Sequence, residues 1–276
     1  NSSSLAAGVY DGTVTITALA SANASNSPQV LPVTLVVGQP LVFQNGVVNA
    51  ASFSRAAVVS PGSIVALFGA NLSAGADVAS ILPLPRMLAG TQVLVNNVPA
   101  PLFFVSPDQI NFQVPPGAAP PSVSVNVVSG GVRGPAATIH IAPQEPGIFT
   151  IPAGGSGPAA VVNQDATINS VENPAPPGSV IAIYATGLGA TNPPVAAGEP
   201  GALEPPFNVT VLSPRVIIGE IGEAPAELFF SGMAPGFAGL YQVNARVPFT
   251  TQPGNAVRLR IEIGGRTSNV VTIAVR

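Results

Sequence analysis

The chain has 276 residues, enough for two domains of ordinary size, and a formal net charge of −3. Only 8% of its residues are charged and all nine basic residues are arginine, so no basic stripe exists to neutralise phosphates, and nucleic-acid binding is disfavoured. The same low charge gives little repulsion between copies, so self-association is less opposed than usual.

Glycine (29) and proline (31) are abundant but aperiodic, and they separate runs rich in valine, isoleucine and threonine. This pattern predicts many short strands joined by turns and therefore an all-β protein. Cysteine is absent, so the sequence gives no disulfide evidence on the compartment. No stretch approaches the roughly 18 apolar residues of a spanning helix, so we predict no membrane-spanning segment. If the protein is exported, Asn1 follows a cleavage or lies inside a longer precursor.

Residues 1–38 hold two predicted strands, at 9–17 and 30–37, joined by a Ser/Asn-rich turn. Their sequence resembles the last two strands of the BACON family of bacterial immunoglobulin-like domains, whose first half is missing here. An isolated hairpin is marginally stable in water, so this one is expected to join a sheet elsewhere. It has two interpretations: a fragment that packs on the next module of its own chain, or a strand donor to another subunit.

Residues 39–142 form the first of two sequence repeats. A Pro-Gly-Ser turn at 61–63 opens an apolar run through residue 72, which is typical of a buried strand. Further on, polar residues at 109, 111 and 113 alternate with apolar ones at 110, 112 and 114, which predicts one core face and one solvated face. A glycine pair at 130–131 indicates a hairpin turn before a closing strand at 137–141.

Residues 143–276 repeat this order with longer loops. The segment 177–188 nearly copies 61–72, and 242–248 corresponds to 109–115. The Gly-rich stretch 154–157 lacks the lysine of a phosphate-binding loop and is interpreted as a linker. Residues 231–241 contain an apolar insertion, seven residues longer than its counterpart, that either folds over the end of the sandwich or docks on a partner.

These motifs together resemble an uncharacterised C-terminal domain family of Solibacter and other acidobacteria. The residues that carry the resemblance are the Pro-Gly-Ser turns and the segments 100–104, 106–115, 146–149, 184–189 and 240–244. Each half is also similar to an IPT/TIG immunoglobulin-like domain. The resemblance implies an exported pair of β-sandwiches in a surface or secreted protein, and it brings no catalytic residues.

Reactive side chains are few and scattered. The only histidine, His140, alternates with Ile139 and Ile141 and is expected on the polar face of a strand, in a structural role. A lone histidine without cysteine makes a zinc site improbable, and the Asp-x-Asp spacing of calcium loops is absent. Sugar-binding faces usually display tryptophan or tyrosine rings. Tryptophan is absent and Tyr184 is expected in the core, which leaves only Tyr10 and Tyr241 to be presented to a sugar. We therefore predict no catalytic, cofactor-binding or metal-binding residues and no cofactor.

The sequence thus predicts an N-terminal hairpin (1–38) followed by two tandem immunoglobulin-like β-sandwiches (39–142 and 143–276). The predicted function is that of a non-enzymatic extracellular structural protein of a bacterial cell surface, a filament subunit assembling head to tail with copies of itself by β-strand addition. The alternative is a module of a larger secreted protein that binds carbohydrate or the cell surface. A hydrolase comes third, because it would need two facing carboxylates.

Overall fold

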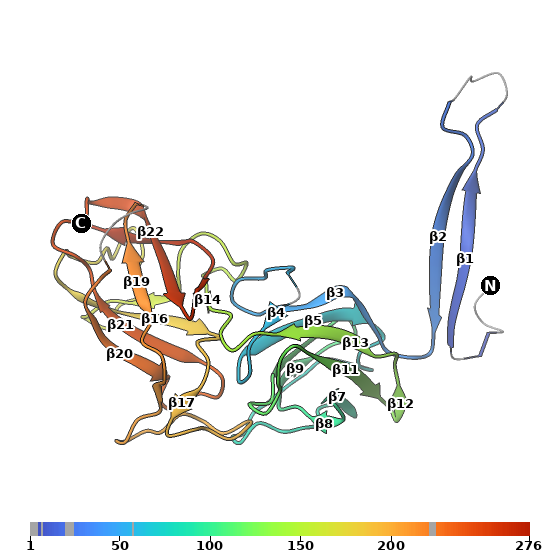
Figure 1. The fold of residues 1–276 in the computed structure, drawn as a ribbon, viewed down its shortest axis with the longest axis horizontal. Coiled ribbons are helices and arrows are strands. Elements are labelled where there is room, and N and C mark those ends of the chain that lie inside the picture. The colour runs from blue at the N-terminus through green and yellow to red at the C-terminus, as the bar shows by residue number, and fades with distance from the viewer. Residues whose placement is uncertain (1–4, 7, 20–24, 57, 221–224) are drawn as a thin grey trace.

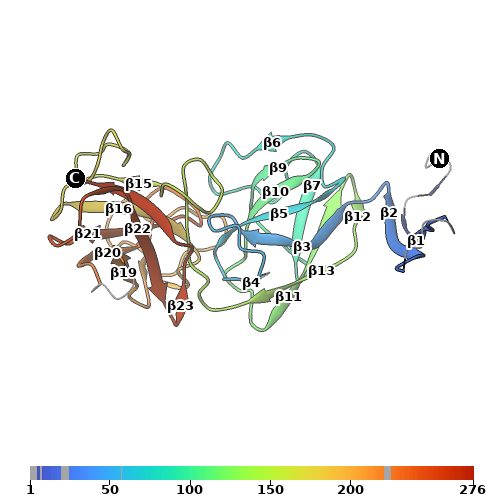
Figure 2. The ribbon, with the colours of Figure 1, turned by 90° about the horizontal axis from the view of Figure 1, so that it is seen from above.

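A computed structural model describes residues 5–6, 8–19, 25–56, 58–220 and 225–276. All regular elements among these residues are β-strands, so the predicted all-β fold of tandem β-sandwiches is confirmed. The chain is elongated, with the hairpin at one end of the long axis and the C-terminus at the other (Figure 1). Seen from above, the two sandwiches follow each other along this axis (Figure 2).

The N-terminal hairpin is a separate two-stranded sheet that stands off the first sandwich (Figure 1). Strand β1 (Gly8–Ile16) pairs antiparallel with β2 (Gln29–Val37) over nine residue pairs without a bulge. Both predicted strands are therefore present, and each of their four ends lies within one residue of the expected limit. Neither strand pairs with any other described strand.

The first sandwich consists of two sheets, and all of its strand pairs are antiparallel except β4 with β13. One sheet has the order β3 (Leu41–Asn49), β5 (Ile64–Ala70), β10 (Gln109–Gln113), β9 (Leu102–Val105) and β6 (Asp77–Val78). The other has the order β4 (Val58–Val59), β13 (Ala137–Ile141), β11 (Ser122–Ser129), β7 (Thr91–Val95) and β8 (Val98–Pro99), with β12 (Val132–Arg133) also on β11. Their inward side chains form one core centred on fully buried residues such as Leu67, Leu102 and Phe112.

The second sandwich repeats this plan with a larger first sheet. That sheet has the order β14 (Gly147–Ile148), β16 (Val180–Thr186), β21 (Tyr241–Arg246), β20 (Leu228–Met233), β18 (Val209–Thr210) and β17 (Thr191–Asn192), with β15 (Val161–Val162) also on β16. In the other, β22 (Gly254–Ile263) pairs with β19 (Arg215–Ile218), β23 (Arg266–Thr267) and β24 (Val271–Val275).

Each sandwich has its own core. Ile181, Ile183, Val243 and Leu259 are fully buried in the second core, which draws only on residues from 148 onward, whereas the first draws on residues 47–141. The predicted domain limits 39–142 and 143–276 are compatible with these cores and stay a prediction.

The repeated Pro-Gly-Ser turns have the same geometry in both sandwiches. Gly62 and Gly178 adopt φ of +78° and +85°, a left-handed conformation that glycine reaches without a Cβ clash. The hydroxyls of Ser63 and Ser179 donate to the carbonyl three residues earlier, each at 2.6 Å. The turn therefore sets the starting direction of the following strand in the same way in both sandwiches, β5 in the first and β16 in the second.

Candidate functional site

The hairpin has one apolar face that nothing in the described chain covers. Residues that pair across the two strands share a face, and so do residues two apart along one strand. The register thus places six large apolar side chains on the same side, each 36–55% exposed: Tyr10, Val14, Ile16, Leu31, Val33 and Leu35. We call this set the hairpin face.

The opposite side of the hairpin is polar along its middle. Asp11, Thr13, Thr15 and Thr34 lie there, and the Thr34 hydroxyl donates to Asp11 Oδ1 at 2.8 Å. This side also carries Pro32 and the exposed Val9 and Val30, so it is mixed, whereas the hairpin face has large apolar side chains on both strands.

Both long edges of the hairpin are open among the described residues, because β1 and β2 pair only with each other. Open strand edges carry unpaired backbone donors and acceptors that favour pairing with a further strand. The hairpin thus offers two kinds of contact at once, an apolar face and a hydrogen-bonding edge.

A second feature lies at the start of the first sandwich, where the β3–β5 ladder is interrupted. Val42 pairs with Gly69 and Val47 pairs with Leu67, so residues 43–46 stand opposite Phe68 alone. Glycine is required at position 46, since a Cβ there would lie 2.6 Å from the Phe68 carbonyl oxygen. The bulge turns residues 43–45 outward, and their side chains are exposed.

The bulge borders a pocket of about 280 Å³ that we call the bulge pocket. Its lining includes three phenylalanines, two amides and one arginine: Phe43, Gln44, Asn45, Phe53, Arg55 and Phe68. Phe43 is 49% exposed, and Phe53 and Phe68 are half-buried. Sequence reasoning sought sugar-binding faces among tryptophans and tyrosines and so passed over these phenylalanines.

The two sandwiches meet through buried polar side chains. Gln113, predicted on a solvated face, is 2% exposed, which corrects that prediction. Its side chain donates to the Gly62 carbonyl at 3.1 Å and accepts from the Gly198 amide of the second sandwich at 2.7 Å. Contact with the neighbouring sandwich therefore buries a residue that the period-two pattern alone assigns to solvent.

The insertion at 231–241 contacts the first sandwich at Gly239, where an added Cβ would lie 2.9 Å from Ile64 Cγ1. Docking of the insertion on a partner stays a prediction. Fully buried Thr186 accepts from the Ile64 amide at 2.9 Å and donates to the Gly239 carbonyl at 2.9 Å. A cavity of about 400 Å³ at this junction has five prolines and Tyr241 in its lining.

In the stretch 154–157, predicted to be a linker, Gly155 is buried against the first sandwich, whereas residues 154, 156 and 157 are exposed. A Cβ on Gly155 would lie 2.2 Å from the Ser52 carbonyl oxygen. The Thr150 hydroxyl accepts from the Gly154 and Gly155 amides at 3.1 Å each. This connecting stretch is thus fixed at Gly155, where two backbones approach closely.

The burial of one histidine and two tyrosines can be compared with the sequence predictions. His140 is exposed beside buried Ile139 and Ile141, as strand alternation predicts. Tyr184 is half-buried rather than in the core, and Tyr241, predicted to be presentable, is 3% exposed. Burial raises the pKa of Tyr241, whose hydroxyl donates to the Gly189 carbonyl.

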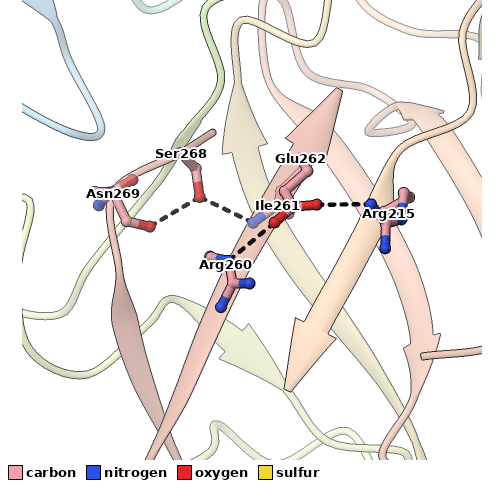
Figure 3. A network of polar contacts seen from close by, with 6 residues as sticks. All are labelled: Arg215, Arg260, Ile261, Glu262, Ser268 and Asn269. Atoms are coloured by element: carbon pink, nitrogen blue, oxygen red, sulfur yellow. Dashed lines mark hydrogen bonds and ion pairs between the residues drawn. The ribbon is translucent and has the colours of Figure 1, made fainter. Parts of the chain in front are cut away.

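Several carboxylates of the second sandwich form ion pairs with arginines. On β22, Glu262 accepts from Arg215 and Arg260, each at 3.1 Å (Figure 3). In the same network Ser268 Oγ accepts from the Ile261 amide at 2.9 Å and donates to the Asn269 carbonyl at 2.8 Å. These groups stabilise the sheet.

Glu145 lies in the segment between the sandwiches. Burial raises the pKa of its carboxyl, and Arg266 at 3.6 Å partly offsets this effect. Glu220 and Glu227 form ion pairs with Arg258 and Arg246, while Glu223 lies outside the described residues.

Within the described ranges, no three histidine, cysteine, aspartate or glutamate side chains come together as a metal site would require. The same ranges contain no helix with the length and apolarity to cross a membrane.

The sequence of residues 48–141 matches the IPT/TIG domain family. The immunoglobulin-like part of the expected resemblance is thereby confirmed, while the acidobacterial and BACON-like assignments stay predictions. No curated protein matches the chain.

Two solved structures are among those to which the chain is similar. The Bacteroides ovatus mixed-linkage glucan utilization locus protein SGBP-B, in complex with a mixed-linkage heptasaccharide, is 12% identical with a TM-score of 0.36, and the match covers 99% of this chain and 54% of that one. Domains 5–6 of the S-layer protein SbsC are 13% identical with a TM-score of 0.26, and the match covers 86% and 98% of the two chains. The chain thus spans about half the length of the first of these proteins.

Proposed function

We propose that this chain is a non-enzymatic structural protein of a bacterial cell surface that assembles with other copies of itself through its N-terminal hairpin. The observation that carries the proposal is the exposed hairpin face, lying on a strand pair with both edges open. A two-stranded hairpin is marginal by itself, so a partner that covers this face would stabilise both the hairpin and the assembly.

The magnitude of this burial indicates how the partner binds. Fully burying a large aliphatic side chain contributes roughly 1.5–3 kcal/mol, so covering six half-exposed ones contributes on the order of 6 kcal/mol. Association costs at least about 4 kcal/mol before any side chain is ordered. The hairpin face alone therefore gives weak binding, and strand addition along an open edge must supply further backbone hydrogen bonds.

The arrangement we propose is head to tail, along the long axis. The hairpin lies at one end of this axis and the C-terminus at the other (Figure 1). A second hairpin could offer only an equally small face, whereas the body of a sandwich offers a larger sheet surface. A contact between unlike surfaces repeats from copy to copy, and it produces a filament when the rotation between copies does not close a ring.

Negative-stain microscopy and sedimentation of the full chain, compared with a variant that lacks residues 1–38, test this proposal. Filaments or long oligomers are expected from the full chain and single particles from the deletion variant. Monodisperse full-length particles at high concentration would contradict the proposal, and so would assembly that is unchanged by the deletion.

The second candidate function is that of a module that anchors to a cell-surface glycan. The bulge pocket favours it, because sugar-binding sites combine aromatic rings with a few polar groups such as side-chain amides. Retention of the full chain on purified cell-wall polysaccharide, lost in Phe43→Ala, would support this function.

A further inference from the structure

We propose that the bulge pocket binds a single acidic pyranose ring, a uronic acid unit of a polysaccharide. The inference rests on the second candidate function and specifies its ligand class. It does not depend on assembly through the hairpin, which is a separate surface of the chain.

The shape and apolar lining of the pocket fit one ring. Its volume of about 280 Å³ lies just under the roughly 300 Å³ at which pockets for small molecules begin. The rings of Phe43, Phe53 and Phe68 provide apolar surface for the C–H face of a sugar. A polysaccharide could therefore place one unit in the pocket while its neighbours stay in solvent.

The polar lining indicates an acid. Arg55 is the only charged residue of the lining, and it forms no ion pair with any described residue. A guanidinium binds a carboxylate through two parallel hydrogen bonds. Gln44 and Asn45 each offer an amide that can donate to and accept from ring hydroxyls.

Other ligand classes fit less well. A phosphate group carries more charge than one arginine neutralises, and the lining contains no second cation. An apolar peptide side chain would remove Arg55 and two amides from water without giving them partners, which is unfavourable. A carboxylate on a hydroxylated ring satisfies all three groups.

The backbone of the pocket is held in an uncommon conformation. Phe53 has φ of +52°, in the left-handed region that bulky residues seldom adopt, and Asn45, of a type that adopts it more readily, has φ of +55°. Such conformations persist where the surrounding structure enforces them, and they gather at ligand-binding sites. Both residues with positive φ, Asn45 in the bulge and Phe53 after it, line the bulge pocket.

Saturation-transfer NMR on the full chain, with glucuronate and glucose as probes, tests the proposal, since the two sugars differ only at C6. Glucuronate is expected to bind roughly tenfold more tightly than glucose, a difference of about 1.4 kcal/mol. Phe43→Ala should weaken glucuronate binding at least about tenfold, and Arg55→Gln should lower it to the level of glucose. Phe229→Ala, which removes an equally exposed ring elsewhere, is the matched control.

Absence of transfer to either sugar would overturn the proposal, as would equal binding of both sugars or binding that survives Phe43→Ala. Circular dichroism and thermal unfolding of each variant exclude loss of folding as the cause. The variant lacking residues 1–38 should keep sugar binding while losing assembly. Failure of one proposal is thereby distinguished from failure of the other.

Discussion

The Ile64 amide of the first sandwich donates a hydrogen bond to the Thr186 hydroxyl of the second at 2.9 Å, across 122 positions of sequence. In the second repeat the equivalent amide, that of Val180, is bonded at 3.0 Å to a side chain of its own sandwich, Gln164. The same position after the Pro-Gly-Ser turn is thus satisfied locally in one repeat and by the neighbour in the other. This difference joins two similar modules end to end.

Replacing Thr186 by valine should destabilise the protein by about 2–3 kcal/mol. The change leaves the Ile64 amide and the Gly239 carbonyl buried without their partner, and each unsatisfied group costs about 1–3 kcal/mol. Urea unfolding measures the effect. Thr186→Ser keeps the hydroxyl and should lose only about 1 kcal/mol; equal losses in the two variants would show that the hydroxyl is unimportant.

Gly62→Ala should destabilise by about 1–2 kcal/mol, because alanine is strained at φ of +78°. No steric clash contributes, since the nearest atom to the added Cβ is the Tyr241 hydroxyl oxygen at 3.8 Å. Gly117→Ala is the control, with open space around it and no positive φ, and should be neutral or slightly stabilising. Thermal unfolding compares the two, and identical melting temperatures would contradict the assigned role of this turn.

Glu145→Gln should make the protein more stable at pH 7, and the gain should shrink as the pH falls toward 4. Burial raises the pKa of this carboxyl above its unfolded value, so the folded state binds more protons between the two values and its stability falls as pH rises through that window. Arg266 offsets part of the effect. Melting temperatures of both proteins between pH 4 and 7 measure it.

A variant less stable than the native protein at pH 7 would show that the ion pair with Arg266 outweighs the cost of burial. Arg266→Gln is the matched variant. It removes the compensating cation, and should enlarge the pH-dependent loss of stability in the native carboxyl background.

The strands of the fold could be predicted from the sequence because their signals are local. The alternation around Ile110 and Phe112, and the repeated Pro-Gly-Ser turns, depend only on neighbouring residues. The position of Gln113 could not be predicted, since its burial results from contact with Gly198, 85 positions away.

The candidate sites were predicted less completely, for the same reason. The sequence predicts the hairpin as a strand pair without the rest of a domain. Its apolar face, however, follows only from the strand register, which places Val14 opposite Leu31. The bulge pocket gathers Phe43, Phe53 and Phe68 through a ladder interruption that leaves little trace in the sequence.

Sedimentation velocity of two single variants of the hairpin tests the central claim most directly. Val14→Lys places a charge in the hairpin face, and Thr13→Lys places the same charge one residue away on the polar side. The account predicts that Val14→Lys sediments as a monomer while Thr13→Lys assembles like the native chain. Equal assembly of the two variants, or none in the native chain, would contradict it.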